Sequence, residues 1–549
     1  MRKNIISSVV AMVLISSCAD QLDVKNPNQP TASAVNSENN IVALGLGIYA
    51  DGFRGLKFGG FQGTLLNDVF AYHEGMGDII GCEAANVYIN QLIMPDEVTL
   101  DNGAKVPNPA NPKTQVGLLR FANQNSFADQ SPVVYEWAYM YNAINICNAI
   151  LASVDKITFT GDQDSKRNTL KAWAYWWKGW AYGRIGSMYY AGIITDEPGK
   201  TNPNYKSKED IIAESNSNYD KATTALNAIT VAADYTATLT RVIPSINQVG
   251  RGAVPTIDMF KRNISTMKAR NILVNTKVSA MTTSQWNDII TLTNAGIQSG
   301  TNVFTGRSNA TADFMSATGG TVALVAAGDP SAVTYKISER LIQDFRPGDN
   351  RLAKNFETPV IGGRWLGNSD RGTIFNTRYR LVSGGTTLGG SAIVYANRTA
   401  GSGEAFLAGT YEENELMKAE AFIRLGGQSN IDQGVAVINT VRTFQGAGLT
   451  ALVAGLSQSA AAEELRSERR VALAFRGLAF YDARRWGVID PVSSGGGRSG
   501  AVVLSATGVV NTNATINYNY LDYWDVPDND LVFNPPAAGS APVKNPRSN

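Results

Sequence analysis

The sequence predicts a mainly α-helical fold of helix pairs, interrupted by long irregular loops and minor β structure. Several segments place apolar residues at the spacing of one helix face, and these segments follow one another in pairs. Glycine is frequent, with 52 of 549 residues, which favours long loops between the helices. A chain of this length holds either several domains or one large unit built from repeats.

The first 17 residues have the features of an export signal. Arg2 and Lys3 form a charged start, and the apolar run from Ile5 to Ile15 is too short to anchor stably in a bilayer. Cys18 follows two serines, a pattern similar to a bacterial lipobox, so we expect its lipidation by acyl chains such as palmitate. Residues 18–40 are polar, with prolines and asparagines, and predict a flexible lipidated tether.

The repeat helices are expected in two groups, at about 132–300 and 410–487. Their expected bounds are 132–154, 169–190, 208–229, 258–278, 282–300, 412–427, 430–446 and 463–486. Gly426, Gly427 and Gly446 are expected helix C-caps. Residues 169–190 are apolar nearly all round, which predicts a buried helix. Small and bulky residues alternate in adjacent helices, which resembles tetratricopeptide packing.

Two regions lack helical periodicity. Residues 51–131 are rich in glycine and predict loops, and residues 301–410 are rich in glycine, threonine and serine, with short β-type runs such as 373–382. Binding residues concentrate in loops when a rigid scaffold holds them. We therefore expect these two loop-rich regions to carry the functional site.

The composition excludes several functions. The formal net charge of +1 lacks the basic excess that nucleic-acid binding requires. His73 is the sole histidine, so no metal site with two histidines can form, and any Ser-His or Cys-His catalysis would depend on this residue. No GxSxG or phosphate-loop motif occurs, and we expect no enzyme activity, metal or cofactor. Cys82 and Cys147 could pair, but two separate buried thiols are favoured because the sequence gives no reason to bring them together.

Adjacent carboxylates could serve a glycoside hydrolase. They occur at Glu412-Glu413 and Glu463-Glu464, both at expected helix starts, where acidic side chains favour the helix dipole. We therefore expect a structural role for both pairs.

The arginines of 463–486 could bind an anion, but an internal network is the favoured interpretation. Asp482 can reach Arg485, and Glu463 can reach Arg466, one helical turn away in each case. The arginine stems would pack on neighbouring aromatic rings, because buried charges persist when they are paired.

One pattern near the C-terminus is similar to a known family. It contains, in order, Glu468-Arg469-Arg470, Leu473-Ala474-Phe475, Gly477, Phe480-Tyr481-Asp482 and Arg484-Arg485-Trp486-Gly487. This segment, followed by YLDYWDVPDNDLVFNP at 520–535, resembles the signature of the SusD/RagB family of outer-membrane lipoproteins. The departures, at Ala472, Arg476 and Ala483, concern local packing. The resemblance implies that residues 41–549 form a SusD-like domain.

The resemblance also implies a function. Such a protein would be non-catalytic, lipid-anchored to the cell outer membrane and exposed at the surface. It would bind an oligosaccharide or polysaccharide nutrient and deliver it to a SusC-like TonB-dependent transporter, which it would cap like a lid. A peptide ligand, as in the RagB branch, a lipid-anchored glycoside hydrolase and a helical scaffold for protein partners are the alternatives.

A sugar ring stacks its apolar C–H face on an aromatic side chain, and its hydroxyls need polar groups at the rim. The candidate ligand-binding residues are Tyr72, His73, Asp78 and Tyr88 in the first loop-rich region, Arg364, Trp365 and Arg371 in the second, and Trp137 at a helix start. Trp365 is the strongest of these, because it follows two glycines in a polar loop without apolar periodicity. The tryptophans of 169–190 are expected in the core.

Overall fold

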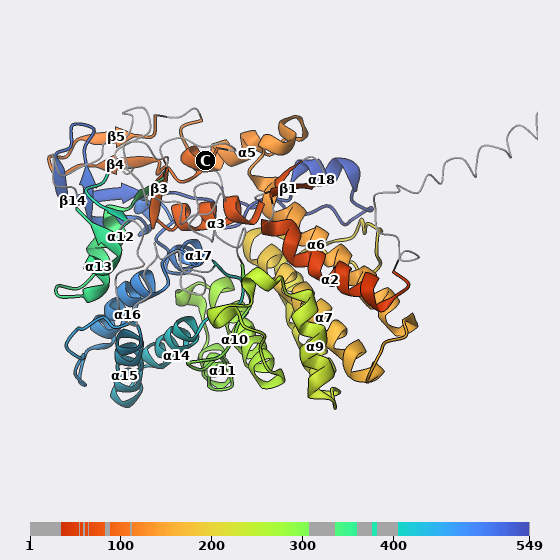
Figure 1. The fold of residues 1–549 in the computed structure, drawn as a ribbon. Helices are drawn as coiled ribbons and strands as arrows, with labels where there is room; N and C mark the ends of the chain where they lie inside the picture. The colour runs from red at the N-terminus through yellow and green to blue at the C-terminus, as the bar shows by residue number, and fades with distance from the viewer. Residues whose placement is uncertain are drawn as a thin grey trace, which may run out of the picture.

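A computed structural model gives the fold in two layers, with repeat helices below and a smaller layer of strands and short helices above (Figure 1). The structure describes residues 35–53, 55–58, 61–63, 65–82, 88–109, 112–306, 335–358, 376–381 and 405–547. Helix α3 (Leu65–Met76) runs between the two layers, and the short helix α17 (Ala479–Arg485) packs beneath it (Figure 1).

The lower layer is built from helix pairs, which confirms the predicted fold class. Its helices are α2 (Glu38–Phe53), α6 (Val133–Ser153), α7 (Gln163–Met188), α8 (Lys208–Asn227), α9 (Ala232–Val242), α10 (Ile257–Asn275), α11 (Thr283–Asn294), α14 (Tyr411–Leu425), α15 (Gln428–Phe444) and α16 (Gln458–Ala472). Successive helices contact each other in the order α6, α7 and α8, and again in the order α10, α11, α14, α15 and α16. Each helix thus buries a face on its neighbours, as the repeat pattern predicts.

Local signals set the helix ends. Gly426, with a φ of 73°, ends α14, and Gly446, with a φ of 65°, follows the end of α15, so both predicted caps are confirmed. Gly427 instead begins α15 as its N-cap, because only Gly426 and Gly427 separate the two helices. At the other ends, threonine and serine side chains accept backbone N–H groups, as Thr282 does from Gln285 in a capping box.

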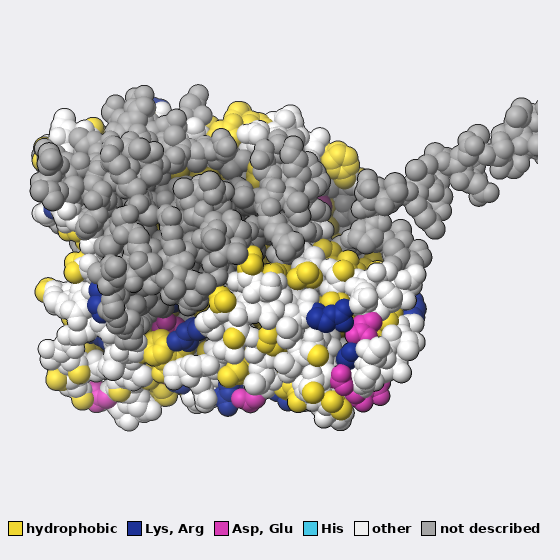
Figure 2. Space-filling view, viewed as in Figure 1, with side chains coloured by type: hydrophobic (Ala, Val, Ile, Leu, Met, Phe, Trp, Pro, Cys, Tyr) yellow, Lys and Arg dark blue, Asp and Glu magenta, His cyan; other side chains and the backbone are white. Residues whose placement is uncertain are grey.

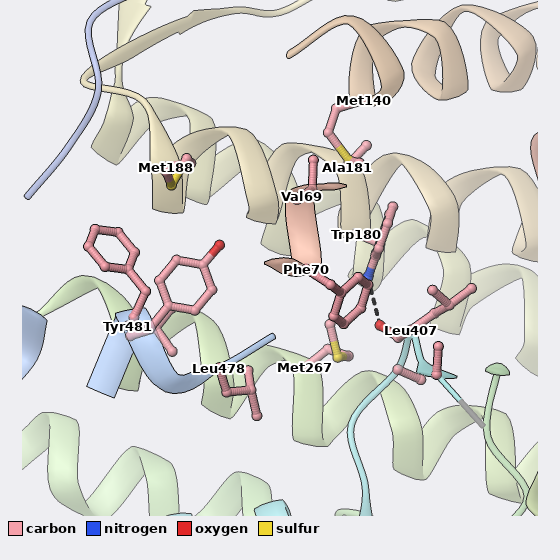
Figure 3. Close-up of a cluster of buried hydrophobic side chains, with 14 of the residues drawn as sticks. Val69, Phe70, Met140, Trp180, Ala181, Met188, Met267, Leu407, Leu478 and Tyr481 are labelled. Atoms are coloured by element: carbon pink, nitrogen blue, oxygen red, sulfur yellow. Dashed lines mark hydrogen bonds between the residues drawn. The ribbon is translucent and has the colours of Figure 1, made fainter. Parts of the chain in front are cut away.

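Helix α7 is buried on nearly all sides, as predicted. Trp173, Trp176, Trp177 and Trp180 are fully buried. The indole of Trp180 donates to the carbonyl of Leu407 at 2.7 Å, in a cluster that also contains side chains of α3 and α10 (Figure 3). The indole of Trp176 donates to Asn263 at 2.8 Å. These bonds matter because a buried indole N–H without an acceptor is costly.

The upper layer joins distant parts of the chain. An antiparallel sheet has the order β13 (Arg498–Leu504), β14 (Val510–Asn517), β4 (Glu97–Thr99) and β5 (Lys105–Pro107). In its register Ile516 lies opposite Val98, so the C-terminal hairpin completes a sheet begun near the N-terminus. This sheet and several two-stranded pairings confirm the expected minor β structure.

The remaining elements are short. They are β1 (Gly55–Phe58), β2 (Phe61–Gly63), β3 (Ile80–Cys82), α4 (Ile89–Leu92), α5 (Gln115–Ala122), η2 (Asn125–Gln130), η3 (Val154–Lys156), β6 (Ala191–Ile193), β7 (Tyr205–Ser207), η4 (Ser245–Asn247), η5 (Gly250–Gly252), η6 (Val278–Ala280), β8 (Thr305–Gly306), β9 (Tyr335–Ile337), α12 (Glu339–Asp344), α13 (Asn350–Asn355), β10 (Phe356–Glu357), β11 (Arg380–Leu381), β12 (Ala405–Phe406), η10 (Val492–Ser494) and α18 (Asp528–Phe533). Cys82 in β3 and Cys147 in α6 are both buried and are not joined by a disulfide.

Two sequence-based expectations about secondary structure were wrong. Residues 51–131 were expected to be loops, but they contain α3 and α5, because buried polar residues such as His73 and Glu74 interrupt the apolar pattern of α3. Residues 463–486 were expected to form one helix, but α16 ends at Ala472 and α17 begins at Ala479. The break contains Phe475 and Gly477 at positive φ values of 61° and 69°.

The contact between α3 and α17 leaves no room for a side chain at Gly77. A Cβ there would lie 2.3 Å from the Cβ of Ala479 and 2.7 Å from the backbone nitrogen of Phe480. We predict that Gly77→Ala destabilises the protein by about 3 kcal/mol or more, because backbone rather than a flexible side chain must move. Urea unfolding measures this loss.

The matched control is Gly47→Ala in α2, where a Cβ meets nothing within 4 Å. Alanine is the better helix former, so this variant should be neutral or up to about 1 kcal/mol more stable. Equal stabilities for the two variants would contradict the close approach at Gly77.

Candidate functional site

Three of the predicted ligand-binding residues belong to the interior around α3. Tyr72 is buried and packs edge-on against Trp524, with ring centroids 6.0 Å apart. His73 is fully buried, and its Nε2 lies 3.1 Å from a carboxylate oxygen of Glu136. Glu136 also pairs with Arg184 at 2.6 Å. Glu136 thus has both His73 and Arg184 as partners, whereas Nδ1 of His73 has no hydrogen-bond partner among the described residues. Because both side chains are buried, a ligand role for Tyr72 and His73 stays a prediction.

The buried histidine favours its neutral form. Burial lowers the pKa of His73, and the carboxylate of Glu136 opposes this shift only in part. The ring lies 4.8 Å from the ring of Tyr481 in α17. His73 therefore ties α3 to the C-terminal signature by packing, and to α6 by its contact with Glu136.

The neighbouring Glu74 binds the break in the signature. Its carboxylate accepts the backbone N–H groups of Phe475 and Gly477, both at 2.8 Å. Burial raises the pKa of Glu74 to about 7, although these backbone donors favour the carboxylate. The unusual backbone between α16 and α17 is thus held by an acidic side chain from α3.

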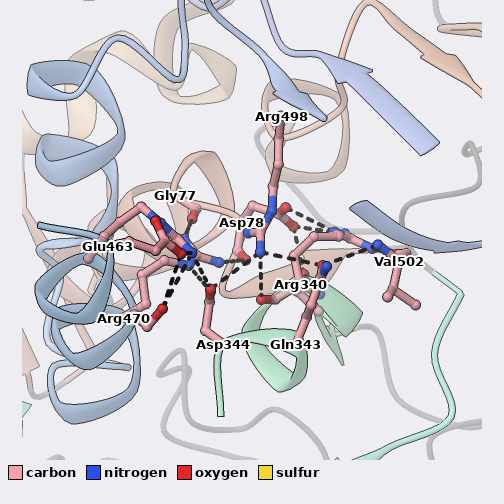
Figure 4. Close-up of polar contacts among 12 residues, drawn as sticks. Gly77, Asp78, Arg340, Gln343, Asp344, Glu463, Arg470, Arg498 and Val502 are labelled. Atoms are coloured by element: carbon pink, nitrogen blue, oxygen red, sulfur yellow. Dashed lines mark hydrogen bonds and ion pairs between the residues drawn. The ribbon is translucent and has the colours of Figure 1, made fainter. Parts of the chain in front are cut away.

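Asp78 lies at the edge of a cavity of about 390 Å³ (Figure 4). It has a φ of 57°, which is uncommon outside glycine. Its carboxylate accepts bonds from Arg340 at 2.7 and 2.9 Å, from Ser338 at 2.7 Å and from Tyr518 at 2.5 Å. Burial acts to raise the pKa of Asp78, but the charge of Arg340 outweighs it and the pKa lies well below its usual range.

The signature arginines form the predicted internal network. Arg485 pairs with Glu420 at 2.6 and 2.7 Å and with Asp482 at 2.7 Å, and Asp482 also binds Arg469. The side chains of Arg485 and Glu420 are fully buried. The guanidinium of Arg485 also lies 4.6 Å from the ring of Trp486. The predicted pairing of Asp482 with Arg485 is therefore confirmed.

The adjacent carboxylates also have basic partners. Glu413 pairs with Arg270, Glu412 lies 3.4 Å from Arg476, Glu463 pairs with Arg466, and Glu464 pairs with Arg346 and Arg442. These contacts agree with the structural role expected from their places near helix starts.

Trp137 is buried, and it positions another element. Its indole donates to Asp530 of α18 at 3.2 Å, and Tyr205 donates to the same carboxylate at 2.6 Å. The ring packs against Tyr141 and Tyr189. The structure thus gives Trp137 a role in fixing α18 to the repeat helices, and its direct ligand contact stays a prediction.

Tyr88 lies in a partly exposed cluster of rings and amides. Its ring is 6.1 Å from Phe127, whose ring is 5.1 Å from Phe121, and Phe121 is 46% exposed. Asn529 of α18 donates to Asn125 at 2.8 Å beside these rings. We call the set Tyr88, Phe121, Asn125, Phe127 and Asn529 the aromatic–amide surface. Hydrophobic side chains reach the surface over α5 and beside α18 in Figure 2.

The backbone of Tyr88 is unusual as well. Its φ is 59° and its ψ is 18°, in the left-handed region that bulky residues avoid. Residues held in such conformations cluster at functional sites. Tyr88 was named from the sequence, and its ligand role stays a prediction, whereas Phe121 and Phe127 were not named, although the segment FANQNSF places two rings on either side of amides.

Trp365, Arg364 and Arg371, together with the neighbouring Asn368, lie outside the described residues. Their expected role in ligand binding stays a prediction.

The C-terminal part of the chain matches a known family, and the fold is similar to solved structures. Residues 411–535 match the sequence profile of the SusD family. A SusD superfamily protein from Bacteroides vulgatus has a similar structure, with a TM-score of 0.53 and 15% identity, over 91% of this chain and 97% of that one. A SusD-like carbohydrate-binding protein from Bacteroides fragilis gives a TM-score of 0.53 and 14% identity, over 91% and 99% of the two chains. A SusD-like carbohydrate-binding protein from Bacteroides vulgatus gives 0.52 and 13%, over 92% and 98%. None of the curated proteins matches the sequence.

The matched segment covers the signature, and the fold similarity covers most of the chain. The C-terminal segment thus matches the SusD family, as its pattern predicts, and the fold of the chain is similar to those of SusD-superfamily structures. Among the helices that the structure describes, none combines the length and the apolar character needed to cross a membrane.

The buried Glu74 makes stability depend on pH. The folded pKa of about 7 exceeds the ordinary value of 4.5, so the folded state binds more protons than the unfolded state between these pH values. The contribution of Glu74 to stability therefore falls as the pH rises from about 4.5 to about 7. Glu74→Gln keeps an acceptor oxygen but does not titrate. We predict that its free energy of unfolding, relative to that of the wild type, rises by about 1–3 kcal/mol when the pH is raised from 5 to 8.

Urea unfolding of both proteins at the two pH values tests this prediction. Asp96, whose pKa burial raises to about 6, titrates in both proteins and cancels in the difference. A difference in free energy of unfolding between the two proteins that does not change with pH would contradict the prediction.

Proposed function

We propose that the protein is a non-catalytic, cell-surface glycan-binding lipoprotein of a nutrient-uptake system. It is anchored to the outer membrane through lipid on Cys18, and it delivers an oligosaccharide to a SusC-like TonB-dependent transporter. The family match and the fold support this proposal, since two of the similar structures are named as SusD-like carbohydrate-binding proteins.

The aromatic–amide surface is the observation that carries the proposal. Sugar rings present apolar C–H faces together with many hydroxyls, so they need aromatic rings flanked by donors and acceptors. Phe121 and Tyr88 supply partly exposed rings, and Asn125 and Asn529 supply amides beside them. Amides donate and accept without charge, which suits neutral hydroxyl groups.

The scaffold beneath this surface is fixed before a ligand arrives. Asn123 links the two segments that carry the surface, because its amide donates to the carbonyl of Val526 at 3.0 Å and accepts the N–H of Asp528 at 2.9 Å. Trp137 and Tyr205 hold the adjacent Asp530. A pre-organised surface loses less conformational entropy on binding, which favours capture of a flexible oligosaccharide.

The expected absence of catalysis is part of the proposal. The adjacent carboxylates near helix starts pair with arginines, whereas a general acid needs a raised pKa. Glu412, for example, is buried; burial acts to raise its pKa, but the charges of Arg476 and Arg251 outweigh this and lower it.

A glycan array followed by calorimetry tests the proposal. We predict that Tyr88→Ala and Phe121→Ala each weaken binding of the selected oligosaccharide by about three- to tenfold, through loss of ring stacking. The matched control is Val453→Ala, which removes a 72% exposed apolar side chain between α15 and α16 and should leave the affinity unchanged.

Three outcomes would count against the proposal. Binding of peptides but not glycans would favour the RagB-like alternative, and cleavage of the oligosaccharide by the wild-type protein would favour a glycoside hydrolase. If neither ring substitution weakens glycan binding, the aromatic–amide surface is not the binding site.

A further inference from the structure

The cavity beside Asp78 is separate from the aromatic–amide surface and has a different chemistry. Its volume of about 390 Å³ lies within the usual range for small-molecule sites, roughly 300–1,000 Å³. It is lined by arginines of α16 and β13, by Asp78, and by the rings of Trp486 and Tyr518 (Figure 4). The cavity therefore combines basic donors with aromatic walls.

The arginines differ in how fully the protein uses them. Each of the three nitrogens of Arg470 has a partner: they donate to Asp344 at 2.5 Å, to the carbonyl of Gly77 at 2.6 Å and to the carbonyl of Asp78 at 2.8 Å. Arg498 has partners for only one of its nitrogens among the described residues. Its Nη2 donates to the carbonyl of Arg340 at 3.2 Å and has longer contacts with Asp344 at 3.4 Å and Gln343 at 3.5 Å.

Spare donors therefore remain at the cavity. Within the described part of the chain, Nε and Nη1 of Arg498 have no hydrogen-bond partner, although the side chain is only 15% exposed. Arg466 uses Nε and Nη2 on Glu463 and Asp344, which leaves its Nη1 without a partner among the described residues. Charged N–H donors of arginine make short, strong hydrogen bonds with the oxygens of a carboxylate.

The local charge favours an anion. The cavity and its first neighbours contain four guanidinium groups and three carboxylates, an excess of one positive charge, from Arg340, Arg466, Arg470 and Arg498 and from Asp78, Asp344 and Glu463. The adjacent Glu339 has its own partner in Arg378 at 2.7 Å. Burial lowers the pKa of Arg498, and the charge of Arg470 acts in the same direction while Asp344 opposes it. The positive charge of Arg498 is thus only partly balanced by the carboxylates around it.

We propose that this cavity binds the carboxylate of an acidic sugar unit, a uronic acid, with its oxygens accepting from the spare donors of Arg498 and Arg466 and its ring beside Trp486. One negative charge matches the excess of one positive charge. The indole of Trp486 is fixed by a bond to Glu420 at 3.2 Å, so the ring is pre-oriented as a wall of the cavity. This inference rests on the proposed function, because it takes the ligand to be a saccharide.

Calorimetric titration of the purified protein with galacturonate and with galactose tests the proposal. We expect wild-type protein to bind galacturonate, and galactose at least about tenfold more weakly, because the neutral sugar makes no charge-assisted bond. Arg498→Gln should weaken galacturonate binding by about tenfold or more. Arg498→Lys should have an intermediate affinity, since lysine keeps the positive charge but not the planar guanidinium group.

Two further variants keep the test independent of folding. Arg466→Gln changes a cavity arginine whose side chain is 29% exposed, so it should fold normally and still weaken galacturonate binding. Arg262→Gln changes an arginine of similar exposure in α10, paired with Asp258, and should bind galacturonate like wild type. Thermal unfolding of each variant shows which of them are folded.

Equal binding of galactose and galacturonate would overturn the proposal, as would full affinity in folded Arg498→Gln and Arg466→Gln. If wild-type protein binds neutral oligosaccharides but not galacturonate, the acidic-sugar site is wrong and the proposed function stands. If it binds neither, the proposed function fails as well.

Discussion

The fold depends on the buried pairing of Arg485 with Glu420. Both side chains are fully buried, and two short bonds join α17 to α14 where the last repeat ends. Removing two charges from water is expensive, and only close pairing with further hydrogen bonds compensates for it. Asp482 and Trp486 supply those bonds, so the signature folds around one fixed orientation of α17.

This orientation determines where the upper layer sits. Helix α17 lies under α3, and Glu74 of α3 binds the backbone break that precedes α17. The segment after α3 carries Asp78 to the cavity, and Arg470 of α16 binds its backbone there. A sequence rich in arginine, glutamate and aromatic residues thus acts as internal scaffold, while its outer edge contributes to a binding cavity.

The helix pairs, the buried tryptophans and the ion pairs Asp482–Arg485 and Glu463–Arg466 could be predicted, because each follows from spacing within one segment. The pair of Arg485 with Glu420 joins residues 65 positions apart and could not be predicted in this way. The expected loops at 51–131 were partly wrong, since α3 buries His73 and Glu74 on partners more than 60 residues away, and no local pattern shows such pairing. The same limit applies to the candidate site. Tyr88 was predicted from its loop, but its neighbours Phe121 and Asn529 come together only through tertiary packing.

The central claim, that the buried pair of Arg485 and Glu420 is scaffold and takes no part in the aromatic–amide surface, is tested most directly by Glu420→Gln, with stability and the affinity for a neutral oligosaccharide measured on the same protein. Loss of one buried charge should lower the free energy of unfolding by about 3–5 kcal/mol. The exposed pair of Asp258 and Arg262 gives the reference, where Asp258→Asn should cost less than about 1 kcal/mol. The account predicts an unchanged glycan affinity for folded Glu420→Gln; unchanged stability together with lost affinity would contradict it.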